Sequence, residues 1–251
     1  MNQSVIKAVK LLDLFTEDIQ ELPLREIASR ANIPKPTAYR LLSSLVACGF
    51  LQKSQNEYDS SYKLGLKLLE LGNLVSNRLE IREIALPFME RLAQEINEVV
   101  HIVIANQNEA TYIEKVDSSR AIRLYTRIGK STPLYIGSGP KLLLAFMEEE
   151  KQKEILGAPN LYVISDQNQI NKSKLRNELL AIRQEGYAYS IGEQDSETTG
   201  ISYPLYNYNG QVIAALTVSG LSSHFEGENL QVIKSHTKHT ADSISEKLGF
   251  Q

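Results

Sequence analysis

Apolar residues at the start of the chain recur every three or four positions, which is the spacing of one face of an α-helix. The first such stretch predicts a helix over residues 4–15, with Ser4 as its N-cap. Its apolar face consists of Val5, Val9, Leu12 and Phe15. A shorter helix is predicted over residues 25–30, with an apolar face made of Leu24, Ile27, Ala28 and Ala31. Residues 18–23 are polar and predict a connection between these two helices.

A third helix is predicted over residues 35–48, after a break at Asn32. Asparagine tolerates the left-handed conformation that ends a helix. Pro34 and Pro36 can begin the next helix because their missing N–H groups would be unpaired in a first turn. The buried face is expected to contain Ala38, Leu41, Leu42, Leu45 and Val46. Cys48 falls on this apolar side and is expected to be buried, and Gly49 is the expected left-handed C-cap.

The second and third helices have the layout of a helix-turn-helix, whose second helix enters the major groove of DNA. The residues at or near its other face are therefore the predicted DNA contacts: Lys35, Pro36, Thr37, Tyr39, Arg40 and Ser43. Two strand-like runs at residues 50–53 and 62–64 surround a polar tip and predict a hairpin, which beside a helix-turn-helix is a wing. Lys53 and Lys63 in this hairpin are expected to hold phosphates. The alternative is a pair of amphipathic helices that binds no DNA.

Residues 65–82 predict a helix that connects the wing to the rest of the chain. Its apolar residues are Leu66, Leu69, Leu74 and Leu79. Amphipathic spacing does not show whether such a face meets a second chain or the core of its own, so a dimer contact and a plain core helix both remain open. Pro87 is expected to start a further helix, with Phe88, Leu92 and Ile96 facing inward.

Beyond residue 97 the pattern changes to the alternation that is typical of β-strands. Strands are predicted at residues 99–105, 111–116, 121–128, 187–191, 200–206 and 212–218. Helices are predicted at residues 142–147, 174–185 and 228–248, with further helical sequence up to residue 156. Turn residues between consecutive strands, such as Asn209-Gly210, imply hairpins and hence an antiparallel sheet. The predicted fold class is α+β: a winged helix-turn-helix (residues 1–64), a linker helix (65–82) and a C-terminal domain (83–251) with an antiparallel sheet flanked by helices.

Composition and charge are compatible with these elements and add a preference for nucleic acid. The 251 residues are 42% hydrophobic and 23% charged, as expected for one or two globular domains. The sequence has neither an apolar run long enough for a membrane span nor a signal peptide, so we expect a cytoplasmic protein. The net charge is −3, yet residues 34–67 carry five basic and two acidic side chains. Positive charge therefore lies on the predicted recognition helix and wing, where phosphate contacts would need it.

Residues suited to other chemistry are few and scattered. Residues 136–141 resemble a phosphate loop only superficially, because Pro140 stands where such a loop has glycine before its lysine. His236 and His239 could face one metal ion, but no third ligand with recognisable spacing accompanies them. His101 lies in an apolar strand and is expected to be a core residue rather than a base. We therefore predict no catalytic residue, no metal and no cofactor, and a protein that is not an enzyme.

Several strings, spread over nearly the whole chain, occur in a familiar order: PKPTAYRLLSSLVACGFL in the third helix, YKLGLKLLELG after the wing, EGYA at residues 185–188 and VIAALTVSG at residues 212–220. Together they resemble the IclR family of bacterial transcriptional regulators. The resemblance implies a winged helix-turn-helix that binds operator DNA as a dimer or a dimer of dimers. It also implies a C-terminal GAF-like domain that binds a small metabolite and alters DNA affinity.

The resemblance further implies an effector pocket in the C-terminal domain. Its positions fall on Leu124, Gly137, Ser138, Gly139, Ser190, Gly200, Thr217 and Ser219. Backbone N–H groups of the glycine-rich segment, at a helix N-terminus, would suit a carboxylate. This chain departs from the family where Ser190 replaces a common aspartate, Gly200 a usual cysteine and Pro140 a glycine. The small keto acid of some relatives therefore cannot be assumed, and Thr217 and Ser219 could instead only hydrogen-bond within the sheet.

Residues and resemblance together predict a sequence-specific transcriptional regulator, a repressor rather than an activator, whose operator binding is modulated by a small organic acid. The expected partners are double-stranded operator DNA, the effector and further copies of the chain. Two other classes of function remain open at this point. A small-metabolite enzyme would turn over a small acid without binding specific DNA, and an adaptor would use its winged helix to bind protein.

Overall fold

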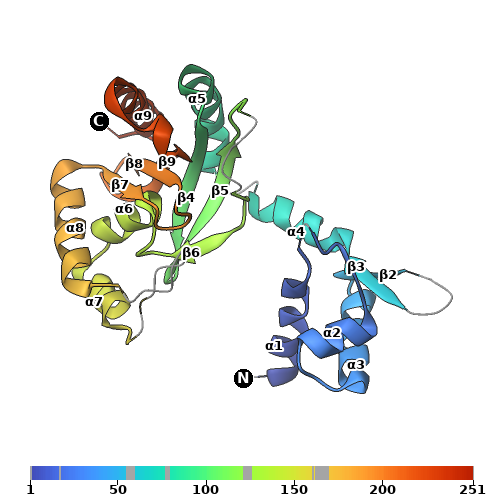
Figure 1. The fold of residues 1–251 in the computed structure, drawn as a ribbon. Coiled ribbons are helices and arrows are strands. Elements are labelled where there is room, and N and C mark those ends of the chain that lie inside the picture. The colour runs from blue at the N-terminus through green and yellow to red at the C-terminus, as the bar shows by residue number, and fades with distance from the viewer. Residues whose placement is uncertain are drawn as a thin grey trace. The chain divides into compact units, whose positions relative to one another are not determined.

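The computed structural model describes residues 2–16, 18–54, 60–76, 80–120, 126–159, 161 and 170–250. The chain forms two compact units, Met1–Leu79 and Glu80–Gln251 (Figure 1). Each unit has its own hydrophobic core and its own sheet, so each is described by itself. Within the described residues, no helix combines the length and the apolar character needed to cross a bilayer.

Helices and a small sheet surround one apolar core in the first unit. The elements are α1 (Gln3–Lys10), η1 (Leu12–Leu14), β1 (Glu21–Pro23), α2 (Leu24–Arg30), α3 (Lys35–Ala47), β2 (Leu51–Ser54), β3 (Ser61–Leu64) and α4 (Leu66–Ser76). The sheet is antiparallel in the order β1-β3-β2. The largest fully buried side chains in the core of this unit are Leu11, Leu22, Ile27, Leu42, Leu51 and Tyr62. Helices α2 and α3 pack together as the predicted helix-turn-helix, and β2 and β3 form the wing strands.

Two predicted left-handed residues set the geometry of the first unit. Asn32 has a φ of 49° in the turn between α2 and α3, and Gly49 has a φ of 77° after α3. The buried face of α3 contains Ala38, Leu41 and Leu42, as the spacing predicted. The sequence therefore located both helices and the turn to within one or two residues.

Five expectations for the first unit are wrong. Helix α1 ends at Lys10 rather than at Phe15, and residues 12–14 form the separate short helix η1. The N-cap of α1 is Asn2 rather than Ser4, since the Asn2 side chain accepts a hydrogen bond from the Ser4 N–H at 3.0 Å. Val5 and Val9 are exposed, because the core side of α1 is turned away from them and is continued by Leu11. Cys48 is also exposed, since it is the C-cap residue at which the chain leaves the helix. The segment expected to be a polar connection contains β1, which pairs with β3 and buries Leu22.

The second unit is built on a larger antiparallel sheet with helices on both faces (Figure 1). Its elements are α5 (Glu80–Ile96), β4 (Val99–Asn106), β5 (Glu109–Val116), β6 (Ser131–Pro133), α6 (Ser138–Phe146), α7 (Glu149–Gly157), α8 (Lys172–Glu185), β7 (Ala188–Ile191), β8 (Thr198–Tyr206), β9 (Val212–Leu221), η2 (Ser222–His224) and α9 (Gly227–Lys247). The strand order is β6-β5-β4-β9-β8-β7. Helices α5 and α9 pack together on one face, and α6 and α8 cover the other.

Alternate residues of strand β9 lie on opposite faces of the sheet, and one of these faces is covered by α6. Successive side chains of a strand point to opposite faces. Ala214, Leu216 and Val218 therefore point to one face, and Ala215, Thr217 and Ser219 to the other. Ala215 belongs to the apolar cluster around α6 and α8, which assigns Thr217 and Ser219 to the α6 face.

Several boundaries in the second unit differ from expectation. Pro87 lies inside α5 rather than at its start, because the buried face of Ala85, Met89 and Leu92 runs on across it. Phe88 is only half-buried, and Met89 takes its place in the core. Helix α6 begins at Ser138, four residues before the predicted position. Of the strand expected at 121–128, residues 121–125 lie outside the described part and residues 126–128 are not strand.

The predicted linker helix over residues 65–82 corresponds to α4 as far as Ser76, and Glu80 already begins α5. Residues 77–79, including Leu79, lie outside the described residues. Leu66, Leu69 and Leu74 of α4 are 72%, 61% and 55% exposed. A helix buried in the core of its own unit would hide such leucines, so the plain core helix is not what the structure shows.

Candidate DNA-binding surface and effector pocket

The apolar face of α3 determines which side chains the helix presents outward. Burial of Ala38, Leu41, Leu42 and Leu45 against the core leaves the opposite side of α3 exposed. The predicted contacts on α3 lie on that side: Lys35, Pro36, Tyr39, Arg40 and Ser43 are exposed and Thr37 is half-buried. Five of them lie in the first two turns, where a recognition helix contacts base edges. The geometry is therefore that of a helix able to enter a major groove.

The two predicted phosphate ligands of the wing lie on opposite faces of the hairpin. Lys53 is paired with Tyr62 across the ladder, and Lys63 is paired with Gln52. Paired residues share a face and neighbours along a strand do not, so Lys53 and Lys63 point to opposite sides. Both are exposed. They could contact phosphates on the two sides of a groove, but not the same phosphate from one face.

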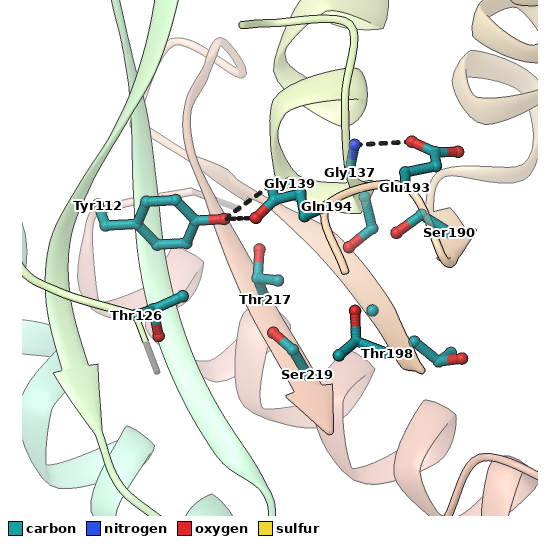
Figure 2. Close-up of a pocket in the computed structure, with 13 residues that line it drawn as sticks. Tyr112, Thr126, Gly137, Gly139, Ser190, Glu193, Gln194, Thr198, Thr217 and Ser219 are labelled. Carbon is teal, nitrogen blue, oxygen red and sulfur yellow. Dashed lines mark hydrogen bonds between the residues drawn. The ribbon is translucent and has the colours of Figure 1, made fainter. Parts of the chain in front are cut away.

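A small polar pocket, with a cavity volume of about 40 Å³, lies between β8, β9 and the N-terminus of α6 (Figure 2). It is lined by most of the predicted effector positions: Gly137, Ser138, Gly139, Ser190, Gly200, Thr217 and Ser219. Leu124 lies outside the described residues. Further lining residues are Tyr112, Thr126, Glu193, Gln194, Thr198 and Thr199. The structure thus brings together lining residues that are up to 107 positions apart in the sequence, Tyr112 and Ser219.

Two glycines allow helix α6 to approach the sheet closely. A Cβ atom on Gly139 would lie 2.6 Å from Thr217 Oγ1, and one on Gly200 would lie 2.7 Å from Ser138 Oγ. Both separations are too short for ordinary side chains, so these positions need glycine while their neighbours keep their present conformations. The cysteine that the family usually has at position 200 would therefore collide with Ser138 in this chain.

A chain of hydroxyl groups links α6 to the sheet inside the pocket wall. Ser202 Oγ donates to Ser138 Oγ at 2.8 Å and lies 2.8 Å from Thr217 Oγ1. Thr217 therefore makes the cross-strand hydrogen bond that was the alternative to ligand binding, while also lining the pocket. Ser202, which is fully buried, was not among the predicted residues. Its place two residues after Gly200 on β8, on the same face, was the signal available.

Glu193 and Gln194 were also missed by the sequence analysis. The Gly137 N–H donates to Glu193 Oε2 at 2.7 Å, and Gln194 Nε2 lies 3.2 Å from the Tyr112 hydroxyl (Figure 2). Burial raises the pKa of the Tyr112 phenol, which keeps this group neutral and able to donate. The N–H of Gly137, predicted to meet an effector carboxylate, thus holds a carboxylate of the chain itself.

Lys141 lies one turn into α6 and is only 1% exposed. Its ammonium group forms ion pairs with Glu178 of α8 and with Glu193, the latter at 2.5 Å. A buried ammonium group is strongly destabilising unless it is paired and hydrogen-bonded. The carboxylates of Glu178 and Glu193 meet this need.

His101 is a fully buried residue of β4 behind the pocket. Its ring lies 3.2 Å from Thr126 Oγ1 and packs edge-on against Tyr112, with ring centroids 5.3 Å apart. Burial, together with the nearby Lys115 ammonium, lowers the pKa of His101 to about 3. The expectation of a core histidine is confirmed. His236 instead contacts Glu95 at 2.8 Å, and no group of three potential metal ligands occurs among the described residues.

The low pKa of His101 predicts an acid-sensitive second unit. A histidine that is neutral when folded takes up a proton on unfolding below its ordinary pKa of 6.5, so folded-state stability falls as the pH falls from 6.5 towards 3. By linkage this amounts to about 1.4 kcal/mol between pH 7.5 and pH 5.5. Urea unfolding of the full chain at both pH values measures the difference. His101→Gln should lose this part of the pH dependence, and an unchanged pH dependence would exclude His101 as its source.

Models of one known protein family match both units of the chain. A family model described as the IclR helix-turn-helix domain matches residues 4–55, and one described as the bacterial transcriptional regulator IclR C-terminal domain matches residues 74–246. The chain belongs to the IclR family. It is 35% identical to the HTH-type transcriptional regulator KipR of Bacillus subtilis, over 99% of this chain and 98% of that protein.

Solved structures of this family resemble the chain as a whole. The IclR of Thermotoga maritima is 29% identical, with a TM-score of 0.78, over 98% of this chain and 99% of that one. An IclR homologue of Microbacterium hydrocarbonoxydans, solved in complex with 4-hydroxybenzoate, is 26% identical, with a TM-score of 0.82 over the same shares of the two chains. This IclR-family chain is thus a transcriptional regulator with a helix-turn-helix DNA-binding domain, and it is not an enzyme.

Proposed function

We propose that this regulator is a repressor whose operator binding is modulated by a small organic acid bound in the pocket between α6 and the sheet. The observation that carries the proposal is the meeting of the glycine-rich N-terminus of α6 with hydroxyl-bearing residues of β8 and β9 in one pocket. Helix N-termini favour negative charge, and hydroxyl groups can bind the polar atoms beside it. The relative from Microbacterium hydrocarbonoxydans was solved in complex with 4-hydroxybenzoate, which is a small organic acid.

For the DNA-binding unit we propose that Lys35, Thr37, Tyr39 and Arg40 position α3 and read bases, with Pro36 and Ser43 beside them. Lys53 and Lys63 hold phosphates. Support comes from the exposure of this side of α3 and of the two wing lysines. Repression requires only that the operator be occupied, whereas activation requires a further surface for the transcription machinery. The simpler requirement favours a repressor.

We further propose that the chain acts in the cytoplasm as a homodimer or a dimer of dimers, with α4 at a contact between copies. The leucines of α4 support this proposal because Leu66 and Leu69 are 72% and 61% exposed. Apolar residues on such a face are typical of helices that pair with another helix. Sedimentation equilibrium of the purified chain measures the state directly, and a monomer at operator-binding concentrations would contradict the proposal.

The function is tested with a DNA duplex selected from a random-sequence library by the full chain. We expect a tight complex with this duplex that acids from a panel of hydroxy acids, sugar acids and aromatic acids dissociate. Gly139→Ala should abolish the response to the acid and keep DNA binding, because its Cβ would lie 2.6 Å from Thr217 Oγ1. Gly157→Ala is the matched control, since its Cβ would meet nothing within 4 Å. An acid response that survives Gly139→Ala would place the effector elsewhere.

A further inference from the structure

Glu193 bridges two positive positions at the edge of the pocket. Its Oε2 accepts the Gly137 N–H at 2.7 Å (Figure 2). Its Oε1 lies 2.5 Å from Lys141 Nζ. Gly137 is the N-cap of α6, and Lys141 is in the first turns of that helix. One backbone donor at a helix N-terminus and one ammonium group form a site for a single carboxylate. In this structure the chain fills that site with its own side chain.

The buried ammonium group of Lys141 needs another anion in place of the Glu193 carboxylate if that carboxylate moves away. The side chain is 1% exposed, and its other anionic partner is Glu178. Loss of a partner from a buried ion pair leaves an uncompensated charge, which is strongly destabilising. A neutral ligand could take the space of the Glu193 carboxylate but not its charge. Only an oxyanion can therefore exchange with Glu193 without this cost.

Glu193 is placed where it can move. Its side chain is 28% exposed, compared with 1% for Lys141. It lies between the end of β7 at Ile191 and the start of β8 at Thr198, outside the ladder hydrogen bonds. Glu193 also lines a neighbouring cavity of about 360 Å³, together with Lys141 and with Glu178 and other residues of α8. A carboxylate that turned away from Gly137 would thus have room on the other side.

The remaining lining of the pocket indicates what accompanies the incoming carboxylate. Ser190, Thr198 and Ser219 supply hydroxyl groups, and Gln194 supplies an amide. The described lining residues include no lysine or arginine. A second anionic group would therefore lack a partner there, whereas hydroxyl or carbonyl groups would find donors and acceptors.

We propose that Glu193 is an internal substitute for the carboxylate of the effector, and that a monocarboxylic acid with hydroxyl or carbonyl groups binds by displacing it from Gly137 and Lys141. The inference rests on the proposed function of the pocket. Competition with Glu193 lowers the affinity for every acid, so only an acid whose accompanying polar groups make further contacts binds tightly. It thereby selects against simple carboxylates such as acetate.

Acetate tests the proposal without knowledge of the effector. In full-length Glu193→Ala the carboxylate site is empty, so acetate should fill it and raise the melting temperature by about 3 °C at ten times its Kd. Wild-type protein and the control Glu197→Ala, which removes an exposed carboxylate from the same segment, should show no such shift. Sodium chloride at equal ionic strength serves as the reference for every variant.

Equal shifts in all three proteins, or no shift in a cooperatively folded Glu193→Ala, would overturn the proposal. If Glu193→Ala fails to fold, Glu193→Gln replaces it. The neutral amide is displaced more easily than the carboxylate, so acetate should then stabilise Glu193→Gln more than the wild type, and an equal effect would refute the proposal. Release of DNA by acids from the wild-type protein, measured in parallel, shows whether the proposed function stands when the role of Glu193 fails.

Discussion

Replacement of Arg40 with alanine should weaken binding of the selected operator duplex by about 1–3 kcal/mol, or roughly 5- to 150-fold in Kd, if Arg40 contacts a base through two hydrogen bonds. Arg40 is exposed in the second turn of α3, on the side opposite the buried Leu41 and Leu42. The planar guanidinium group matches the two acceptors of guanine in the major groove. Gel-shift titration at fixed salt measures the change, because non-specific affinity depends steeply on salt.

The Arg40 result needs a control that removes an arginine from the same unit. Arg30→Ala is suitable, because the Arg30 Nε donates to Glu26 Oε1 at 2.9 Å within α2. Its loss should change affinity by much less than that of Arg40. A base contact further predicts relaxed preference at one operator position, whereas a phosphate contact would weaken all sequences alike. Unchanged affinity of Arg40→Ala would remove this residue from the interface.

Replacement of Lys141 with methionine should destabilise the second unit by about 3 kcal/mol, the lower end of the range for breaking a buried ion pair. Methionine keeps most of the side-chain volume but leaves the carboxylates of Glu178 and Glu193 without their shared cation. These carboxylates are 34% and 28% exposed, so water offsets part of the loss. Urea unfolding of the full chain at pH 7.5 measures the effect, with the two units fitted as separate transitions.

A surface ion pair provides the control for Lys141. Lys153→Met removes the partner of Glu149 in α7, where both side chains are mostly exposed, and should change stability much less than Lys141→Met does. In the double variant Lys141→Met/Glu193→Gln one of the two stranded charges is gone, so part of the loss should be recovered. A Lys141→Met protein as stable as the Lys153→Met protein would mean that the buried ammonium group contributes little.

Local patterns were sufficient for most helices and strands. Helices α2, α3, α8 and α9 and strands β4, β5, β8 and β9 lie close to their predicted positions, because apolar periodicity and turn residues act over a few neighbours. Strands β1 and β6 were missed because each has only three residues and exists through pairing with a distant partner. Pro87 was predicted to start a helix but lies inside α5, because the packing of Ala85 and Met89 on either side of it holds the helix together.

The sequence by itself determined the helix-turn-helix, the α+β class and the family, and the family resemblance supplied seven of the thirteen residues that line the pocket. Only the tertiary structure decided how these residues are used. It placed Lys53 and Lys63 on opposite faces of the wing and turned Val5 and Val9 outward. It also put Glu193 on the N-terminus of α6, where an effector carboxylate was expected. Glu193 and Gly137 are 56 residues apart in the sequence. Their contact forms only once β7 has joined the sheet and α6 has packed on it, so no local sequence pattern predicts it.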